Sequence, residues 1–185
     1  MTTLDGRVIA ITGAAGGLGR AYARTCAEQG ARLVCNDIGA LRDGSGFDPE
    51  IVQQLVDELK ADGHEAVGNA EDTTTMAGAR RTLEQALDTY GRVDGLVVSG
   101  GLLRDRMFVS LDEDDWDAVI AGHLRGHFCP MRTFAAHWRE RAKAGDDVDA
   151  AVVATTSNAG LFAQPGQSNY AAAKAGIAGL GGGVV

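Results

Sequence analysis

The sequence predicts a doubly wound, three-layer α/β domain with about five strands in one parallel sheet. Two observations predict it. Short apolar runs alternate with segments of helical periodicity along the chain, and a glycine-rich turn directly follows the first run. Strands that alternate with helices form a parallel sheet, because right-handed crossovers carry the helices to its two faces. The length of 185 residues suits one domain. We therefore expect a single domain over residues 1–185, with strand order 3-2-1-4-5.

The first half of the chain predicts three strand–helix pairs. Compact apolar runs indicate the strands, and apolar residues at steps of three and four indicate the helices. The predicted strands cover 7–12, 33–36 and 65–69, and the predicted helices cover 20–29, 49–62 and 76–90. Glycines that can end these helices follow them, namely Gly30, Gly63 and Gly91. Asp48 and Pro49 have the residue types of an N-cap and a first helical position.

The second half predicts two further strands, at 93–99 and 150–156, each followed by a helix. The longer helix is expected to begin at the capping box 110–113 and to be kinked at Pro130. The shorter helix is expected over 167–180. The longer helix has one predicted inner face, which comprises Trp116, Ile120, His123, His127, Met131, Phe134 and Trp138.

Composition limits the classes of function. The formal charge of −8 and a pI near 4.9 argue against nucleic acid as a partner, because a phosphate backbone favours a basic face. No apolar run approaches the roughly 20 residues that span a bilayer, and the first residues lack the pattern of a signal peptide. We therefore expect a cytoplasmic protein without a membrane partner. The three cysteines have no metal-ligand spacing, so neither a metal site nor a disulfide is predicted.

A glycine-rich turn lies between the first predicted strand and its helix. Residues 12–19 read TGAAGGLG, with glycines spaced G-x-x-x-G-x-G. Glycine accepts tight turns and leaves the backbone bare where a pyrophosphate approaches the N–H groups of a helix N-terminus. The strand–turn–helix context favours a Rossmann-like dinucleotide site. Its predicted contacts are Gly13, Gly16, Gly17, Leu18 and Gly19.

An acidic residue, Asp37, follows the second predicted strand. A carboxylate there accepts hydrogen bonds from the adenosine ribose and repels a 2′-phosphate, which favours NAD over NADP. Asp37 could instead only cap a turn before Gly39, and Arg42 could meet a phosphate, which leaves NADP as the less favoured cofactor. Asp72 is a candidate contact for the adenine edge, or else the N-cap of the following helix.

Tyr170 and Lys174 lie four residues apart on the last predicted helix, so they share one of its faces. A cation within about 4–6 Å favours a phenolate and lowers its pKa, which would let the tyrosine exchange a proton with an alcohol or ketone. Ser157 follows the fifth strand, at the sheet edge where α/β folds bind their ligands. The alternative for Tyr170 and Lys174 is an ordinary surface pair.

With these motifs together, the sequence resembles the short-chain dehydrogenase/reductase family over about residues 4–180. The resemblance rests on the T-G-x-x-x-G-x-G turn, the acidic end of the second strand, the serine and Y-x-x-x-K. It implies that Tyr170 is the general acid/base and that Ser157 polarises the carbonyl group. It also implies that Lys174 lowers the pKa of Tyr170 and, together with Tyr170, contacts the nicotinamide ribose.

Four segments, 36–39, 103–106, 123–126 and 166–170, carry a narrower resemblance. They are similar to the (3R)-hydroxyacyl-CoA dehydrogenase modules of type 2 peroxisomal multifunctional enzymes and their bacterial relatives. This implies a 3-hydroxyacyl-CoA or hydroxysteroid substrate. His123 stands where the wider family often has a catalytic asparagine, so it is a candidate for the proton relay, or else a core histidine. For His127 we predict the core.

The chain also departs from the wider family at two places. Residues 98–101 read VSGG where the family usually has Asn-Asn-Ala-Gly. Gly100 and Gly101 still permit close approach to the cofactor, but the lost amide predicts a looser junction between strands. The chain stops at Val185, whereas the family usually continues through two more strands and a substrate lid, which predicts an exposed fifth strand.

Two functions follow as hypotheses. The first is an NAD-dependent oxidoreductase that acts on a secondary alcohol or ketone. The second is a truncated, catalytically weak dinucleotide-binding subunit or remnant. The family resemblance further implies a homodimer or homotetramer and a small-molecule substrate.

Overall fold

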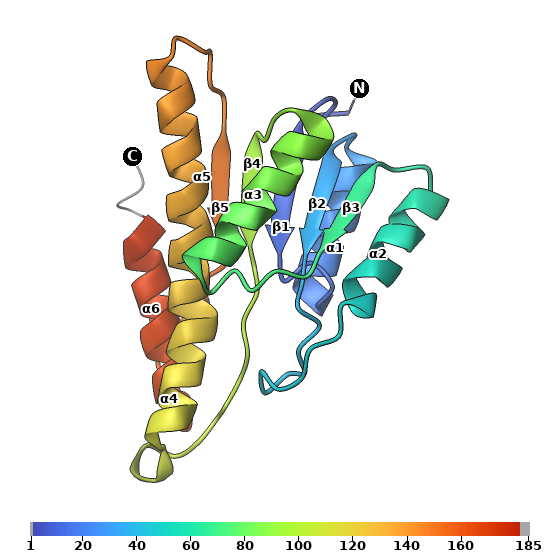
Figure 1. Cartoon of the computed structure of the whole chain (residues 1–185). Helices are drawn as coiled ribbons and strands as arrows, with labels where there is room; N and C mark the ends of the chain where they lie inside the picture. Colours follow the sequence, from blue (N-terminus) through green and yellow to red (C-terminus); the bar gives the residue numbers. More distant parts are fainter. Residues whose placement is uncertain (1, 182–185) are drawn as a thin grey trace.

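The computed structural model describes residues 2–181, which form a five-stranded parallel sheet with the order β3-β2-β1-β4-β5 (Figure 1). The strands are β1 Val8–Thr12, β2 Arg32–Asn36, β3 Ala66–Asn69, β4 Gly95–Val98 and β5 Ala151–Ala154. Every neighbouring pair is parallel and joined in register. The predicted fold class and the predicted strand order are thus confirmed.

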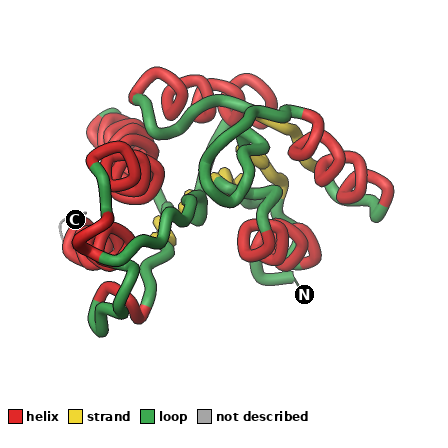
Figure 2. The backbone as a smooth tube through the Cα atoms, turned by 90° about the horizontal axis from the view of Figure 1, so that it is seen from below, coloured by secondary structure: helices red, strands yellow, loops and turns green. Residues whose placement is uncertain are grey.

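The helices lie on both faces of the sheet, as the view along it shows (Figure 2). They are α1 Gly17–Glu28, α2 Glu50–Ala61, α3 Met76–Tyr90, α4 Glu113–Ile120, α5 Gly126–Lys143 and α6 Ser168–Gly181. Side chains of α1 and α2 pack on one face and those of α3 and α5 on the other. α6 packs beside α4 near β5 (Figure 1).

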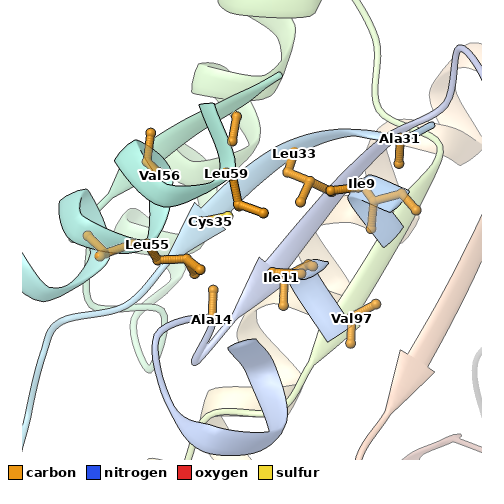
Figure 3. Packing of buried hydrophobic residues seen from close by; sticks show 14 residues of the cluster. Ile9, Ile11, Ala14, Ala31, Leu33, Cys35, Leu55, Val56, Leu59 and Val97 are labelled. Atoms are coloured by element: carbon orange, nitrogen blue, oxygen red, sulfur yellow. The ribbon is translucent and has the colours of Figure 1, made fainter. Parts of the chain in front are cut away.

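The core consists of two apolar clusters, one on each face of the sheet. In the first cluster, Ile11 of β1 and Leu33 of β2 pack together with Leu55 and Leu59 of α2 (Figure 3). These side chains are almost fully buried. Burial of a leucine or isoleucine side chain contributes about 1.5–3 kcal/mol, so this cluster holds the central strands against α2. The carboxyl ends of these strands carry the candidate site.

The long helix differs from its prediction at its start. Asp112, not Ser110, is the N-cap of α4, and its side chain accepts a hydrogen bond from the N–H of Asp115. Ser110 ends a short 3-10 turn, so the predicted capping box at 110–113 is wrong. Ser110 and Asp112 are both N-cap residue types with an acidic residue three positions later. The path of the chain through the 3-10 turn leaves Asp112 at the helix end.

A π-helical turn, Ala121–Arg125, separates α4 from α5. The regular helix is therefore interrupted before Pro130, which lies inside the regular α5. A π turn holds more residues than an α turn and rotates the residues before it relative to those after it. Trp116 is accordingly 37% exposed, although the uninterrupted period of 3.6 placed it on the inner face. His123, which lies within the π turn, is buried.

The fifth strand is exposed as predicted. Only β4 pairs with β5 within residues 2–181, and alternate residues of β5 are exposed, including Val153 at 51%. Strand edges of this kind can pair with further strands. Within the same described residues, no helix is long and apolar enough to cross a membrane.

Candidate active site

The glycine-rich turn joins β1 directly to α1. Gly13 has a φ of +65°, and a Cβ at this position would lie 2.5 Å from the Cα of Gly100, so both the conformation and the space require glycine. A Cβ on Gly19 would overlap the carbonyl oxygen of Gly13. α1 begins at Gly17, three residues earlier than predicted, with Gly16 as its N-cap.

The start of α1 is open to an anion. The N–H groups of Gly17, Leu18 and Gly19 have no acceptor among the described residues, as is usual for a first helical turn. They lie beside a cavity of about 530 Å³ that the turn, Asp37, Asp72, Gly100 and Gly101 all help to line. All the cofactor contacts that the sequence predicted in the turn therefore meet at one cavity, although Gly13 and Gly19 also serve the packing of the turn. A dinucleotide's pyrophosphate fits this set of free donors.

Asp37 lies at the end of β2, and its carboxylate is held by two backbone donors. The N–H of Ala15 lies 3.0 Å from one oxygen, and the N–H of Gly39 lies 2.8 Å from the other. Asp37 therefore ties the glycine turn to the following loop, which includes the capping role considered from the sequence. Each carboxylate oxygen can accept a further hydrogen bond, so this role is compatible with a ligand in the same cavity.

Asp72 lines the same cavity but does not cap α3. Its carboxylate accepts hydrogen bonds from the N–H and the hydroxyl of Thr74, at 2.9 and 2.7 Å. The N-cap of α3 is Thr75, which accepts from the N–H of Gly78. The alternative role that the sequence offered for Asp72 is therefore wrong, and its possible contact with adenine stays a prediction.

A second cavity, of about 300 Å³, brings together the four predicted catalytic residues. Ser157, Tyr170, Lys174 and His123 all line it, although they come from three separate segments: the π turn, the chain after β5 and α6. It shares Gly101 and other wall residues with the larger cavity. The two candidate sites are therefore neighbours at the carboxyl edge of the sheet, where ligands of doubly wound folds bind.

Lys174 is held beside Tyr170 by the backbone. Its Nζ donates a hydrogen bond of 2.7 Å to the carbonyl of Thr155 and lies 5.7 Å from the centre of the Tyr170 ring. Only 3% of Lys174 is exposed, and this burial lowers its pKa from 10.5 to about 8. At neutral pH the Lys174 side chain is therefore protonated in most molecules of the protein. The two residues are not an ordinary surface pair.

His123 packs edge-on against Tyr170, with ring centres 5.1 Å apart. Its Nε2 lies 2.7 Å from the carbonyl oxygen of Leu102 and 3.2 Å from the backbone nitrogen of the same residue, so it donates to the first or accepts from the second according to the tautomer. Nδ1 is buried without a hydrogen-bond partner among the described residues. Burial, followed by the charge of Lys174, lowers the pKa of His123 to about 4, so the ring is neutral near pH 7.

Ser157 and His127 differ in their surroundings. Ser157 is partly exposed, and its hydroxyl contacts its neighbours Asn158 and Ala159 at 3.2 Å. These contacts are local, so the hydroxyl can turn toward a ligand. His127 is fully buried, and its Nδ1 lies 2.7 Å from the carbonyl of His123. This burial agrees with the core position predicted for His127.

The junction after β4 is tied by a residue that the sequence analysis passed over. The hydroxyl of Ser99 donates a hydrogen bond of 2.8 Å to the carbonyl of Thr12, which joins β4 to β1. The predicted loosening at 98–101 is therefore wrong at this point, because a serine supplies a tie between the strands. Leu102 and Thr155 were also missed. They act through backbone groups, which carry no side-chain signal in a sequence.

The fold and the paired cavities define a doubly wound α/β domain of the dinucleotide-binding class. The chain belongs to the short chain dehydrogenase family, whose sequence pattern matches residues 7–183. This family implies an NAD(P) dinucleotide as cofactor.

Three relatives illustrate the match. Hydroxyacyl-CoA dehydrogenase ChsB1 of Mycobacterium tuberculosis is 45% identical, over 97% of this chain and 56% of its own length. Peroxisomal multifunctional enzyme type 2 of Mus musculus is 39% identical, over 95% of this chain and 23% of its own length. The crystal structure of a short chain dehydrogenase from Mycobacterium avium has 48% identity and a TM-score of 0.91, over 97% of this chain and 62% of that one. The chain thus spans less than two thirds of each relative.

Proposed function

We propose that this protein is an oxidoreductase that transfers hydride between NAD and a secondary alcohol or ketone. The observation that carries the proposal is the meeting of Tyr170, Lys174 and Ser157 around one cavity that adjoins the glycine-lined cavity. A bound dinucleotide supplies or accepts the hydride. The residues of the chain bind both partners, orient them and move the accompanying proton.

Each residue has a distinct part in the proton transfer. The hydroxyl of Tyr170 exchanges the proton with the substrate oxygen as general acid/base. The Ser157 hydroxyl donates a hydrogen bond to the same oxygen and polarises the carbonyl group. The charged Lys174 lies 5.7 Å from the Tyr170 ring and stabilises negative charge on the phenol oxygen.

His123 has a supporting part in this scheme. It lines the catalytic cavity against Tyr170, and its ring is neutral near pH 7, which suits a neutral member of a proton relay. Because the backbone of Leu102 contacts its Nε2, the orientation of the ring is fixed relative to the cavity.

Asp37 favours NAD over NADP in this proposal. Its carboxylate stands at the end of β2 in the wall of the larger cavity, where it would accept hydrogen bonds from ribose hydroxyls and repel a 2′-phosphate. Arg42 lines both cavities and has no ion-pair partner among the described residues, so weaker use of NADP is compatible with the site.

For the substrate we propose a 3-hydroxyacyl-CoA and its 3-oxo product, with a hydroxysteroid as the second candidate. The names of the relatives support a hydroxyacyl-CoA, since one is a hydroxyacyl-CoA dehydrogenase. We further propose a homodimer or homotetramer in the cytoplasm. Trp116 and Phe128 support self-association, because these large side chains are 37% and 46% exposed on α4 and α5.

Oxidation of NADH, followed by absorbance with a 3-oxoacyl thioester, tests the function. We expect turnover in the unmodified chain and a loss of about 100-fold or more in Tyr170→Phe, with the Kd for NADH unchanged. Tyr22→Phe on α1, outside both cavities, is the matched control. Equal turnover in Tyr170→Phe and the control, with NADH bound, contradicts the role of Tyr170. Absence of NADH binding contradicts the cofactor proposal.

A further inference from the structure

The five residues Leu102–Arg106, which we call the clamp segment, follow β4 and join both sides of the candidate site. At one end, Leu102 holds the ring of His123 through its backbone. The N–H of Leu103 donates to the carbonyl of Arg42, at 2.9 Å, in the loop after β2. The segment thus touches both a candidate catalytic residue and a loop that lines the dinucleotide cavity.

A buried carboxylate, that of Asp115 on α4, anchors the clamp segment. Its two oxygens face the guanidinium groups of Arg104 and Arg106, at 3.4 and 2.7 Å, and its side chain is only 10% exposed. The arginines hold the pKa of Asp115 below its usual range. Arg104 also donates through Nε to the carbonyl of Asp43, at 2.9 Å. One arginine therefore spans from α4 to the loop after β2.

The same cluster reaches Tyr170 through Asn169, which is fully buried. The side-chain amide of Asn169 donates to the carbonyls of Arg104 and Asp115, at 3.0 and 3.4 Å. Its side-chain oxygen accepts the N–H of Tyr170, at 2.8 Å. All three contacts agree on one orientation of the amide. The backbone that carries the candidate general acid/base is thus fixed to the clamp segment.

Two further bonds join the clamp segment to the turn before α6. The N–H of Arg106 donates to the carbonyl of Gly166, at 2.8 Å, and Gln167 donates to the carboxylate of Asp105, at 3.0 Å. The chain that leads into α6 is therefore bonded to the clamp segment at Gly166 and Gln167 as well as at Asn169. None of these groups touches the catalytic cavity itself.

We propose that Asp115 is a positioning residue for Tyr170, acting through Arg104 and Asn169. The proposal rests on the proposed function, because it takes Tyr170 as the general acid/base. The charge of Asp115 fixes the guanidinium of Arg104, which fixes the Arg104 carbonyl, and that carbonyl and the carbonyl of Asp115 both hold Asn169. A displacement of a catalytic group by about 1 Å can lower turnover about 100-fold. This chain of contacts therefore affects the rate of turnover and not the affinity for the cofactor.

The test removes the charge of Asp115 and keeps the size of its side chain. In Asp115→Asn we expect kcat to fall about 10- to 100-fold, with the Kd for NADH within about twofold of the unmodified chain. We also expect the pH–rate profile to shift, because the loss of the anchor would let Tyr170 move relative to Lys174. Asp117→Asn, an exposed position on the same helix, is the charge-matched control and should leave both quantities unchanged. Asp115→Glu, which keeps the charge, should recover part of kcat.

A readout without turnover separates this proposal from the proposed function. Hydrogen exchange of the amides at 168–174 should become at least about fivefold faster in Asp115→Asn than in Asp117→Asn. If the unmodified chain shows no turnover but the exchange difference is present, the proposed function fails and the positioning contact stands. Unchanged exchange, an unchanged pH–rate profile, or equal losses of kcat and NADH affinity would overturn the positioning role.

Discussion

The imidazole ring of His123 lies directly against the Cα of Gly101. A Cβ built on Gly101 would overlap three atoms of the ring, Cε1, Nδ1 and Nε2. The contact is possible because glycine has no side chain and because the π turn directs His123 toward the end of β4. Gly101 therefore shapes the catalytic cavity, in addition to the cofactor contact that the sequence predicted for it.

The first prediction concerns this contact. In Gly101→Ala, the new methyl group must displace the His123 ring from the Leu102 carbonyl, so we expect kcat to fall by about tenfold or more. The buried hydrogen bond of His123 would also be lost, which should lower the free energy of unfolding by about 1–3 kcal/mol. Steady-state kinetics and urea unfolding measure the two effects.

The double variant Gly101→Ala/His123→Ala is the control for this prediction. Removal of the ring leaves room for the methyl group, so the two changes should be strongly non-additive in unfolding free energy. Additive effects would show that Gly101 and His123 do not interact in the folded protein.

The second prediction concerns the choice of cofactor. Asp37→Asn removes a charge from the wall of the larger cavity while it keeps an acceptor for the N–H of Gly39. We expect the ratio of the Kd for NADPH to the Kd for NADH to fall by about tenfold, since a charge at about 4 Å contributes from about 1 to 4 kcal/mol. Calorimetric titration with both dinucleotides measures the ratio.

Asp57→Asn, an exposed position on α2, matches the change of net charge and should leave the ratio of the two Kd values unaltered. If Asp57→Asn and Asp37→Asn change the ratio equally, the effect belongs to the charge of the whole protein. Asp37 would then have no local part in cofactor choice.

The fold was predictable because its signals are local or repetitive. Apolar strands such as 7–12, the glycine turn and the glycines after the helices each have one physical interpretation, and together they predict the observed strand order. The pairing of Tyr170 and Lys174 was predictable for the same reason, since a spacing of four on a helix places them on one face.

Other features depend on contacts that no local pattern encodes. The burial of Asp115 requires two arginines from a loop nine and eleven residues earlier in the chain, and nothing in that spacing indicates a meeting. The exposure of Trp116 depends on the π turn, which changes the helical phase without a residue that marks it. Ser99 replaces a lost amide through a bond across the sheet, which only the register reveals.

The third prediction is a dependence of stability on pH. Burial, opposed in part by contact with the carbonyl of His123, lowers the pKa of His127 from 6.5 to about 4. The nearby charge of Lys174 adds to this shift, and the neighbouring His123 is lowered to a similar value. The unfolded chain therefore binds more protons than the folded one between pH 6.5 and 4, so stability must fall as the pH falls through this window.

Urea unfolding of His127→Gln at pH 7 and at pH 4 checks this prediction. The variant keeps His123 but lacks one of the two titrating rings. Its loss of unfolding free energy between the two pH values should be smaller than that of the unmodified chain by roughly 3 kcal/mol. Equal losses of unfolding free energy in the two proteins would show that protonation of His127 does not contribute to the fall in stability. His64→Gln, a histidine outside both apolar clusters, is the control.

The fourth prediction concerns the exposed edge of the sheet. Within residues 2–181 only β4 pairs with β5, which leaves the other side of β5 without a strand there, and Val153 adds an apolar side chain that is 51% exposed. Such an edge favours association with another strand, and a lysine on an edge strand opposes it because its charge would have to be desolvated. Val153→Lys should therefore reduce concentration-dependent association in sedimentation experiments without loss of helical circular dichroism.

Trp116→Lys, which changes an exposed site on α4 instead, is the comparison variant. If Trp116→Lys dissociates the protein and Val153→Lys does not, association runs through the helices rather than through the edge of β5.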